Sequence, residues 1–335
     1  MNILYFTHER EYGGSSRALI ALLKELKDKN NIYVVVPFKD SKIINELEEL
    51  GVNTIHCFYS WWQVPIQISY IKKIVYRIAY MFNHVSKMIL LNKIKKLDID
   101  IIHSNTSVID IGARIANRLN IPHMWHFREL QKNNLKFIKG DKKSYAYINE
   151  FGGNIIYISK AVEDYYSKNI TSSKAELIYD GVSEEFIVED RQYKENYEKI
   201  EFLLAGTLHE GKGQHLAVKA IGELKKRGYN NVKLYLAGGD PIGYSKVLEA
   251  IVREYKIEEN VEYLGFVKDL KSIRQKIDIE LICSEAEAFG LVTIEGMLAG
   301  NMLIGSNSGA TGELIKNGEN GYLYQLHHSL LFYFE

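Results

Sequence analysis

The chain has 335 residues, of which 46% are hydrophobic, and its 42 basic side chains are balanced by 42 acidic ones. A chain of this size suits two domains better than one core, and its ordinary composition excludes a disordered protein. A formal net charge of zero provides no overall field to attract nucleic acid, so nucleic acid is not an expected partner.

The compartment is indicated by what the sequence lacks. No run of about 18 uncharged apolar residues occurs, so no membrane span is expected. Met1 leads directly into strand-like residues without a basic segment and cleavage site, so we expect no signal peptide. Cys57 and Cys283 both lie in strand-like segments and fit buried thiols of a reducing compartment. A cytoplasmic protein is therefore expected.

Strand-like and helix-like segments alternate from the start of the chain. The first strand is expected over residues 2–7 and the first helix over 15–27, where leucines recur at helical spacing. Helical stretches separate further strands, which are expected at 32–37, 53–57, 99–103, 123–126 and 154–159. Regular alternation of this kind favours a parallel sheet.

The pattern breaks near residues 175–182, and a polar run over 184–199 follows. We therefore predict one domain over 1–180 and a second over 181–335. In the second, strands are expected at 201–205, 232–237, 261–264, 277–282 and 302–304, and helices at 214–227, 245–255, 291–299 and 311–316. Two doubly wound α/β domains in tandem bind their ligands at the carboxyl ends of the strands, in the cleft between them.

Two glutamates bracket the turn into the predicted helix 291–299. Glu287 falls in the loop before Gly290, and Glu295 lies about one turn into the helix. The unpaired amides of a helix start attract anions. Carboxylates on both sides of such a site suit a ligand with hydroxyls at both ends and phosphate in the middle, which is the shape of a nucleotide sugar. Taken alone, this spacing more often belongs to two solvated surface groups.

Two glycine-containing loops each follow the first strand of a domain. Gly13 and Gly14 allow the backbone to approach a ligand, although the loop lacks the dinucleotide fingerprint and a plain turn would also explain it. In the second domain, Gly206 begins a loop in which Lys212 precedes a helix start. A lysine placed there can neutralise phosphate as a point charge, and the alternative is a solvated surface lysine.

A third cluster of polar residues ends the predicted strand 123–126. His126, Arg128 and Glu129 follow one another closely, and each would need a partner if it were buried. Structural roles are expected instead for His103, His123 and Glu313.

From residue 1 to about residue 324, these segments together resemble the retaining glycosyltransferases of family 4. Residues 287–295 are similar to the Glu-x7-Glu signature of that family, and residues 206–213 to its Gly-Arg-Leu-x-x-x-Lys-Gly element. Two departures occur, at Thr207, where many members carry arginine, and at Arg128-Glu129, where His-Asp is commoner. The resemblance implies a GT-B fold, in which two Rossmann-like domains face each other across a cleft. It further implies that residues 1–180 form the acceptor-side domain and that residues 181–335 bind the nucleotide sugar.

The resemblance also implies roles for individual residues. His126 and Glu287 are expected beside the transferred sugar as catalytic residues, with His126 acting by positioning. Glu295 is expected to accept hydrogen bonds from the ribose hydroxyls. Compensation for the missing arginine at Thr207 could come from Arg128 or His209. The expected donor-binding residues are Gly13, Gly14, Gly206, Lys212, Phe289, Gly290, Leu291 and Glu295.

The implied activity is retaining transfer of a sugar from a nucleotide sugar, with a UDP-sugar favoured. The acceptor would be a saccharide or a lipid-linked saccharide in surface polysaccharide biosynthesis. No DxD motif is needed for this chemistry, so neither a metal nor another cofactor is expected. A sugar-nucleotide epimerase and a non-catalytic binding protein remain as alternatives. Residues 325–335 do not follow the family pattern, so we expect a C-terminally short chain with impaired turnover.

Charge is unevenly distributed in the first domain. No Asp or Glu occurs between Glu49 and Asp98. Basic, aromatic-rich helices can lie on anionic bilayers, which predicts peripheral attachment to the inner face of a membrane through residues 72–96. A long core-packing helix with a solvated basic face is the alternative. The interval contains the cations Lys72, Lys73, Arg77, Lys87, Lys93, Lys95 and Lys96, and the aromatic residues Trp61, Trp62, Tyr70, Tyr76, Tyr80 and Phe82.

Overall fold

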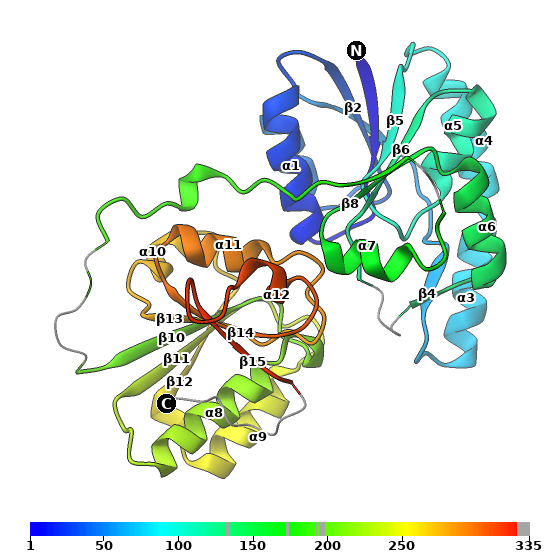
Figure 1. The fold of residues 1–335 in the computed structure, drawn as a ribbon. Helices are drawn as coiled ribbons and strands as arrows, with labels where there is room; N and C mark the ends of the chain where they lie inside the picture. The colour runs from blue at the N-terminus through cyan, green and yellow to red at the C-terminus, as the bar shows by residue number, and fades with distance from the viewer. Residues whose placement is uncertain (131–134, 172–173, 192, 194–197, 327–335) are drawn as a thin grey trace. The chain divides into compact units, whose positions relative to one another are not determined.

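A computed structural model describes residues 1–130, 135–171, 174–191, 193 and 198–326. The chain forms two compact units, Met1–Gly181 and Val182–Glu335, which are described separately below (Figure 1). The expectation for the last residues of the chain falls mostly on 327–335, which lie outside the described residues.

The first unit is built on a seven-stranded parallel sheet with the strand order β3-β2-β1-β5-β6-β8-β9. Its inner strands are largely buried runs rich in Ile, Val, Leu and aromatic residues, as expected where helices cover both faces, whereas the edge strands are more exposed. They are β1 (Asn2–Phe6), β2 (Asn31–Val36), β3 (Asn53–His56), β5 (Ile101–Ser104), β6 (His123–Phe127), β8 (Asn154–Tyr157) and β9 (Ala175–Leu177).

Helices pack on both faces of this sheet. On one face, Leu19 and Leu23 of α1 and Leu47 of α2 share a core with β1 and β2. On the other, Leu90 of α4 and Ile115 of α5 pack against the same central strands. The helices are α1 (Gly14–Leu26), α2 (Ile43–Glu49), α3 (Tyr70–Met81), α4 (Asn83–Ile94), α5 (Ile111–Leu119), α6 (Asp141–Phe151) and α7 (Lys160–Tyr166).

The second unit contains a six-stranded parallel sheet with the order β12-β11-β10-β13-β14-β15. Its strands are β10 (Ile200–Ala205), β11 (Val232–Ala237), β12 (Val261–Gly265), β13 (Ile279–Ile282), β14 (Met302–Ser306) and β15 (Tyr322–Tyr324). Its helices are α8 (Gln214–Lys226), α9 (Ser245–Tyr255), α10 (Leu270–Arg274), α11 (Leu291–Leu298) and α12 (Thr311–Leu314), with 3-10 turns at η1 (Glu184–Phe186), η2 (Glu210–Lys212) and η3 (Glu258–Asn260). Two parallel-sheet α/β units are thus confirmed.

Several elements of the structure were not predicted. β4 (Gln63–Pro65) and β7 (Leu135–Phe137) form a short antiparallel ladder outside the main sheet, and β9 and β15 add edge strands. The alternative of one long core-packing helix over 72–96 is wrong in its length, although Leu90 and Ile94 of α4 do pack into the core. Two helices occur there, and Tyr80 is the one buried residue of α3. Within the described residues, we find no helix with the length and apolar character needed to cross a bilayer.

Candidate active site

Lys212 and Glu287 form an ion pair in the second unit. Lys212 Nζ donates to Glu287 Oε2 at 2.8 Å, and the two side chains are 27% and 14% exposed. Burial by itself raises the pKa of Glu287, but the charge of Lys212 and its hydrogen bond outweigh burial, so the pKa is lowered. Glu287 is therefore an ionised carboxylate beside a cation that is still partly open to solvent.

Glycines allow the two loops of this pair to approach each other. Gly213, at a φ of 71°, ends the loop after β10, and a Cβ there would collide with the carbonyl of Cys283. On the other side, Gly309 adopts a φ of 58° and lies against the backbone of Glu287, whose carbonyl accepts from the Ala310 amide at 2.8 Å. The Gly309–Ala310 turn thus holds the backbone of Glu287, and Gly213 lets the Lys212 loop pack against Cys283.

Gly290 caps the start of α11 with a φ of 97°, and no side chain caps this helix. The amide end of α11 therefore begins immediately after the Glu287 loop, which suits a ligand phosphate. Phe289 is buried beneath the turn, whereas Leu291 is partly exposed.

The loop from Gly206 brings two further predicted residues near Lys212. Thr207 is exposed, and its carbonyl accepts from Gln214 Nε2 at 3.0 Å. Burial, followed by the nearby charge of Lys212, lowers the pKa of His209, so its imidazole stays neutral at physiological pH.

Glu295 is fully buried instead of facing solvent. Its side chain is 1% exposed, and Oε2 accepts from Arg274 Nη1 at 2.7 Å. Arg274 is itself inaccessible and binds Glu280 from β13, with Nη2 donating to Oε1 at 2.8 Å. Gly296 leaves room for the Glu280 carboxylate, because a Cβ on Gly296 would lie 2.6 Å from Glu280 Oε2. A ribose contact for Glu295 stays a prediction, because the structure pairs this carboxylate with the buried Arg274.

In the first unit, His126 and Arg128 belong to a buried polar cluster at the end of β6. Arg128 donates to Asn105 Oδ1 at 2.8 Å and to Asp180 Oδ2 at 2.5 Å, and its Nη2 lies 3.1 Å from His126 Nδ1. Burial first, then the charges of Arg128 and His103, lower the pKa of His126 well below its usual value. His126 is therefore a neutral imidazole, and Arg128 is already paired within its own unit.

Gly13 and Gly14 begin α1, and the structure gives the first of them a specific role. A Cβ on Gly13 would lie 2.5 Å from Glu9 Oε1, so the glycine leaves space for that side chain. Nothing lies within 4 Å of the corresponding position on Gly14. His123 has both ring nitrogens bonded inside the unit, to Ser104 Oγ at 2.9 Å and to the Gly152 carbonyl at 2.8 Å, as expected for a structural histidine.

Sequence reasoning missed several members of these clusters. Asp180 was not singled out, nor were Arg274 and Glu280, although a glutamate inside the apolar strand β13 is itself a signal of a buried partner. His8 and Glu9 were also missed, although both come directly after β1, where ligand-binding residues of parallel sheets concentrate.

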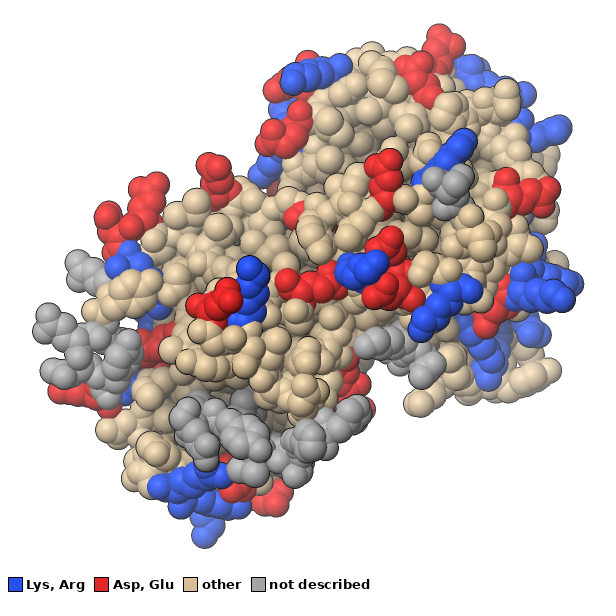
Figure 2. All heavy atoms as spheres, in the orientation of Figure 1, with Lys and Arg blue, Asp and Glu red and all other residues tan. Residues whose placement is uncertain are grey.

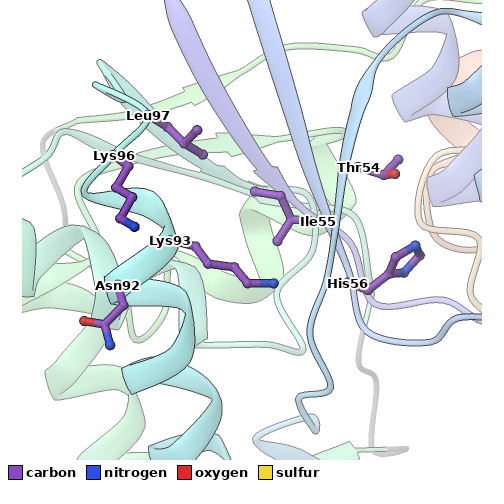
Figure 3. A pocket seen from close by; sticks show the side chains of 7 residues that line it. All are labelled: Thr54, Ile55, His56, Asn92, Lys93, Lys96 and Leu97. Atoms are coloured by element: carbon purple, nitrogen blue, oxygen red, sulfur yellow. The ribbon is translucent and has the colours of Figure 1, made fainter.

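A shallow cavity of about 600 Å³ lies elsewhere in the first unit, between β3 and α4 (Figure 3). Lys93 extends from α4 toward β3, and Lys96 lies on the same wall (Figure 3). None of its seven lining residues carries a carboxylate: Thr54, Ile55, His56, Asn92, Lys93, Lys96 and Leu97.

Two parallel-sheet α/β units with polar clusters at their strand ends define a protein of the GT-B class. Family models support this: Glycosyltransferase Family 4 matches residues 12–186, and Glycosyl transferases group 1 matches residues 186–329. The chain therefore belongs to the family 4, group 1 glycosyltransferases.

Curated relatives carry related names. An uncharacterized glycosyltransferase of Methanocaldococcus jannaschii is 28% identical over 251 residues, which cover 73% of this chain and 66% of that protein. The capsular polysaccharide biosynthesis glycosyltransferase CapH of Staphylococcus aureus is 23% identical over 92% of this chain and 81% of its own length. This chain thus covers 66% of that M. jannaschii protein, and it covers 61% of a second M. jannaschii glycosyltransferase. Both shares are below two thirds of the relative's length.

Solved structures share the fold. HepE of Anabaena, crystallised with UDP-glucose, superposes with a TM-score of 0.76 at 19% identity, covering 97% of this chain and 85% of HepE. The lipopolysaccharide outer core galactosyltransferase WaaB gives a TM-score of 0.69 at 17% identity, over 98% and 87% of the two chains. Both likenesses identify the GT-B fold.

Proposed function

We propose that this chain transfers a sugar from a nucleotide sugar to a saccharide or lipid-linked saccharide in surface polysaccharide biosynthesis, with retention of anomeric configuration. The ion pair between Lys212 and Glu287, at the amide end of α11, is the observation that carries the proposal. HepE binds UDP and UDP-glucose, which supports a UDP-sugar donor. No observation favours the epimerase or the non-catalytic alternative.

Each group of the site has a distinct role in this proposal. Lys212 leaves Glu287 for the donor diphosphate, and the amides at Gly290 and Leu291 stabilise the charge that develops there as the bond to the sugar breaks. Fixed donors of this kind need no reorganisation during the reaction. Glu287, once released, accepts hydrogen bonds from the transferred sugar. The acceptor oxygen bonds to the anomeric carbon on the departing face, and its proton passes to the leaving diphosphate.

Identification of the donor is the first test of the proposal. We expect mass spectrometry of small molecules that co-purify with the full chain to detect a UDP-sugar, or calorimetry with added UDP-glucose to show binding. Absence of binding for UDP and for every UDP-sugar tried would refute a nucleotide-sugar function.

Metal independence is a second expectation. Among the described residues, no three His, Cys, Asp or Glu side chains are grouped as metal ligands, and Lys212 with the α11 amides supplies the positive charge for the diphosphate. Release of UDP in excess chelator should match the rate in added magnesium within about twofold. A loss of turnover in chelator that magnesium or manganese restores would contradict this mechanism.

The chain is further proposed to work at an anionic membrane surface through α3 and α4. Roughly half of the exposed large apolar side chains in the described chain lie between Phe58 and Ile89. Ile71 is 74% exposed, Met81 69% and Met88 66%. An exposed apolar surface of this kind marks an interaction site.

Attachment of α3 to the unit is narrow. Tyr80, its one buried residue, donates to Asp110 Oδ2 at 2.6 Å at the start of α5. The apolar side chains of α3 therefore have little protein to pack against, which suits insertion at a bilayer interface.

Charge on α3 and α4 points to anionic lipid in particular. Val85, Met88 and Ile89 share one side of α4 at helical spacing, and the same side leads to Lys93 and Lys96 at the shallow cavity (Figure 3). In the view of Figure 2, lysine and arginine side chains gather along the edge of the first unit near α3. No carboxylate between residues 49 and 98 opposes them, so an anionic surface is the complementary partner.

Vesicle binding tests this surface. Each cation near an anionic bilayer contributes about 1 kcal/mol, so replacing Lys72 and Lys73 with alanine should weaken binding to phosphatidylglycerol vesicles about 30-fold at low salt. Lys24→Ala with Lys27→Ala on α1 is the matched control and should have little effect. Equal affinity of the two double variants, or no vesicle binding by the parent chain, would exclude the proposed surface.

A further inference from the structure

His8 is a buried histidine near the carboxyl end of β1. It follows β1 and is 7% exposed, and its Nδ1 has no hydrogen-bond partner among the described residues. Its Nε2 lies 4.0 Å from Glu9 Oε1 and 3.9 Å from Glu129 Oε1, which is beyond hydrogen-bond distance. Buried polar groups are nearly always paired, so an unpaired imidazole at a strand end indicates a place for a ligand.

The two carboxylates beside His8, those of Glu9 and Glu129, are held in place by hydrogen bonds from serine residues. Glu129 Oε2 accepts from the Ser107 amide at 2.8 Å and from Ser107 Oγ at 2.6 Å. Glu9 Oε2 accepts from the Ser16 amide at 3.0 Å and from Ser16 Oγ at 2.5 Å. The remaining oxygen of Glu9, Oε1, is directed toward His8, in the space that Gly13 leaves open. The carboxylates are therefore held in place before any ligand arrives.

Trp61 provides an aromatic surface next to these acceptors. Its ring centroid lies 5.5 Å from that of His8, and its Nε1 donates to the His8 carbonyl at 3.4 Å. The side chain is partly exposed, so part of the ring is open to a ligand. An aromatic face attracts weakly positive C–H groups, such as those on the apolar side of a pyranose ring.

The chemistry of the cluster selects among ligands. Two carboxylate groups repel phosphate, so the donor diphosphate does not fit here. Glu9 Oε1 and an imidazole nitrogen are neighbouring hydrogen-bond acceptors, and adjacent hydroxyl groups are the donors that match them. The groups converge at the carboxyl ends of β1 and β6, which flank β5 in the sheet, and ligands of parallel sheets bind at such ends.

We propose that His8, Glu9, Glu129 and Trp61 form a subsite for a neutral pyranose with adjacent free hydroxyls, and that His8 is its specificity-determining residue. This inference rests on the proposed function, in which such a ring is the acceptor saccharide. The sugar stacks on Trp61, one hydroxyl donates to Glu9, and a neighbouring hydroxyl bonds to the His8 imidazole.

The test measures binding of simple glycosides to the full chain by NMR. The probes are the methyl α-glycosides of glucose, galactose, mannose and N-acetylglucosamine, each at tens of millimolar, with glycerol as a polyol that cannot stack. At least one glycoside should shift the His8 Cε1–H signal, and glycerol should not. His8→Phe keeps the ring packing against Trp61 but removes both nitrogens, so it should weaken that binding at least tenfold. His56→Phe, an exposed histidine on β3, is the matched control.

A second readout separates this subsite from the donor site. UDP affinity should be the same in the parent chain, His8→Phe and Glu9→Gln, because the nucleotide is proposed to bind at Lys212 in the other unit. Glu9→Gln keeps the shape and the hydrogen-bonding capacity of the side chain, and it should weaken glycoside binding less than His8→Phe. Failure of all four glycosides to bind a chain that still binds UDP would overturn the subsite and leave the nucleotide-sugar function intact. Undiminished glycoside binding by His8→Phe would overturn it equally.

Discussion

Lys212→Met should lower UDP affinity about 10- to 150-fold, because a hydrogen bond from a cation to a charged group contributes about 1.5–3 kcal/mol. The side chain keeps its length but loses the charge that meets Glu287 at 2.8 Å. Turnover should fall further, by about 100- to 1,000-fold in kcat, because the charge on the leaving diphosphate is largest in the transition state. Calorimetry with UDP and assays of released UDP measure the two effects separately.

The partner variant separates the two roles in the pair. Glu287→Gln should retain UDP affinity within a few-fold, because the diphosphate no longer competes with a carboxylate for Lys212. Its turnover should fall, because the hydrogen bonds to the transferred sugar are weakened. Lys226→Met removes a solvated lysine that is 61% exposed and paired with Glu223, and it should change neither quantity. Normal UDP affinity in folded Lys212→Met would remove this lysine from the donor site.

Arg274→Met should destabilise the second unit by about 3–5 kcal/mol, the usual cost of removing one partner from a buried ion pair. Arg274 and Glu280 are both 0% exposed, and Glu295 is 1% exposed, so two buried carboxylates would lose the cation that they share. Urea unfolding of the full chain, followed in the transition of the second unit, measures the loss. Arg253→Met, at an exposed pair with Glu249 on α9, should cost less than about 0.5 kcal/mol.

The loss in Arg274→Met should depend on pH in a defined direction. Burial already raises the pKa of Glu280 above its ordinary value, and removing Arg274 raises it further. The ordinary pKa of a glutamate is near 4.3. Between this pKa and a higher folded-state pKa, the free energy of unfolding falls as pH rises, because the folded protein keeps a proton that the unfolded chain releases. The variant should therefore recover stability relative to the parent as pH falls from 7 toward 4.5. A stability difference that stays constant over this interval would mean that removing Arg274 does not raise the pKa of Glu280.

The main strands and helices could be predicted from the sequence because each is long enough to show its period. Strands such as β2 and β11 are apolar runs, and α1 repeats leucine at helical spacing. By contrast, β4 and β7 have three residues each, too few for a period, and they pair across about 70 residues of chain. The break between α3 and α4 at Phe82 involves neither Gly nor Pro, so no local signal marks it.

The candidate site was predictable where its residues follow a strand and less so where side chains pair within the core. Glu287 and Lys212 were both placed in loops at strand ends, and the structure brings them together across 75 residues. Glu295 was expected to face a ligand, but only the structure reveals Arg274 beside it, because a contact across two elements leaves no trace in local spacing. A role for His8 and Glu9 could not be predicted from the sequence, because it depends on the nearby side chains of Glu129 and Trp61, which are distant in the chain.

The most direct test of the proposed transfer is an assay of the full chain with UDP-glucose, UDP-galactose and UDP-N-acetylglucosamine. Each donor is offered with the panel of methyl glycosides, in excess chelator. Mass spectrometry detects the glycoside product and released UDP, and NMR gives the configuration of the new bond. We predict that one donor yields UDP and an α-linked product in equal amounts, and that UDP release falls when the acceptor is omitted. Nucleotide binding with no product from any donor and acceptor, or a β-linked product, would contradict the proposed retaining transfer.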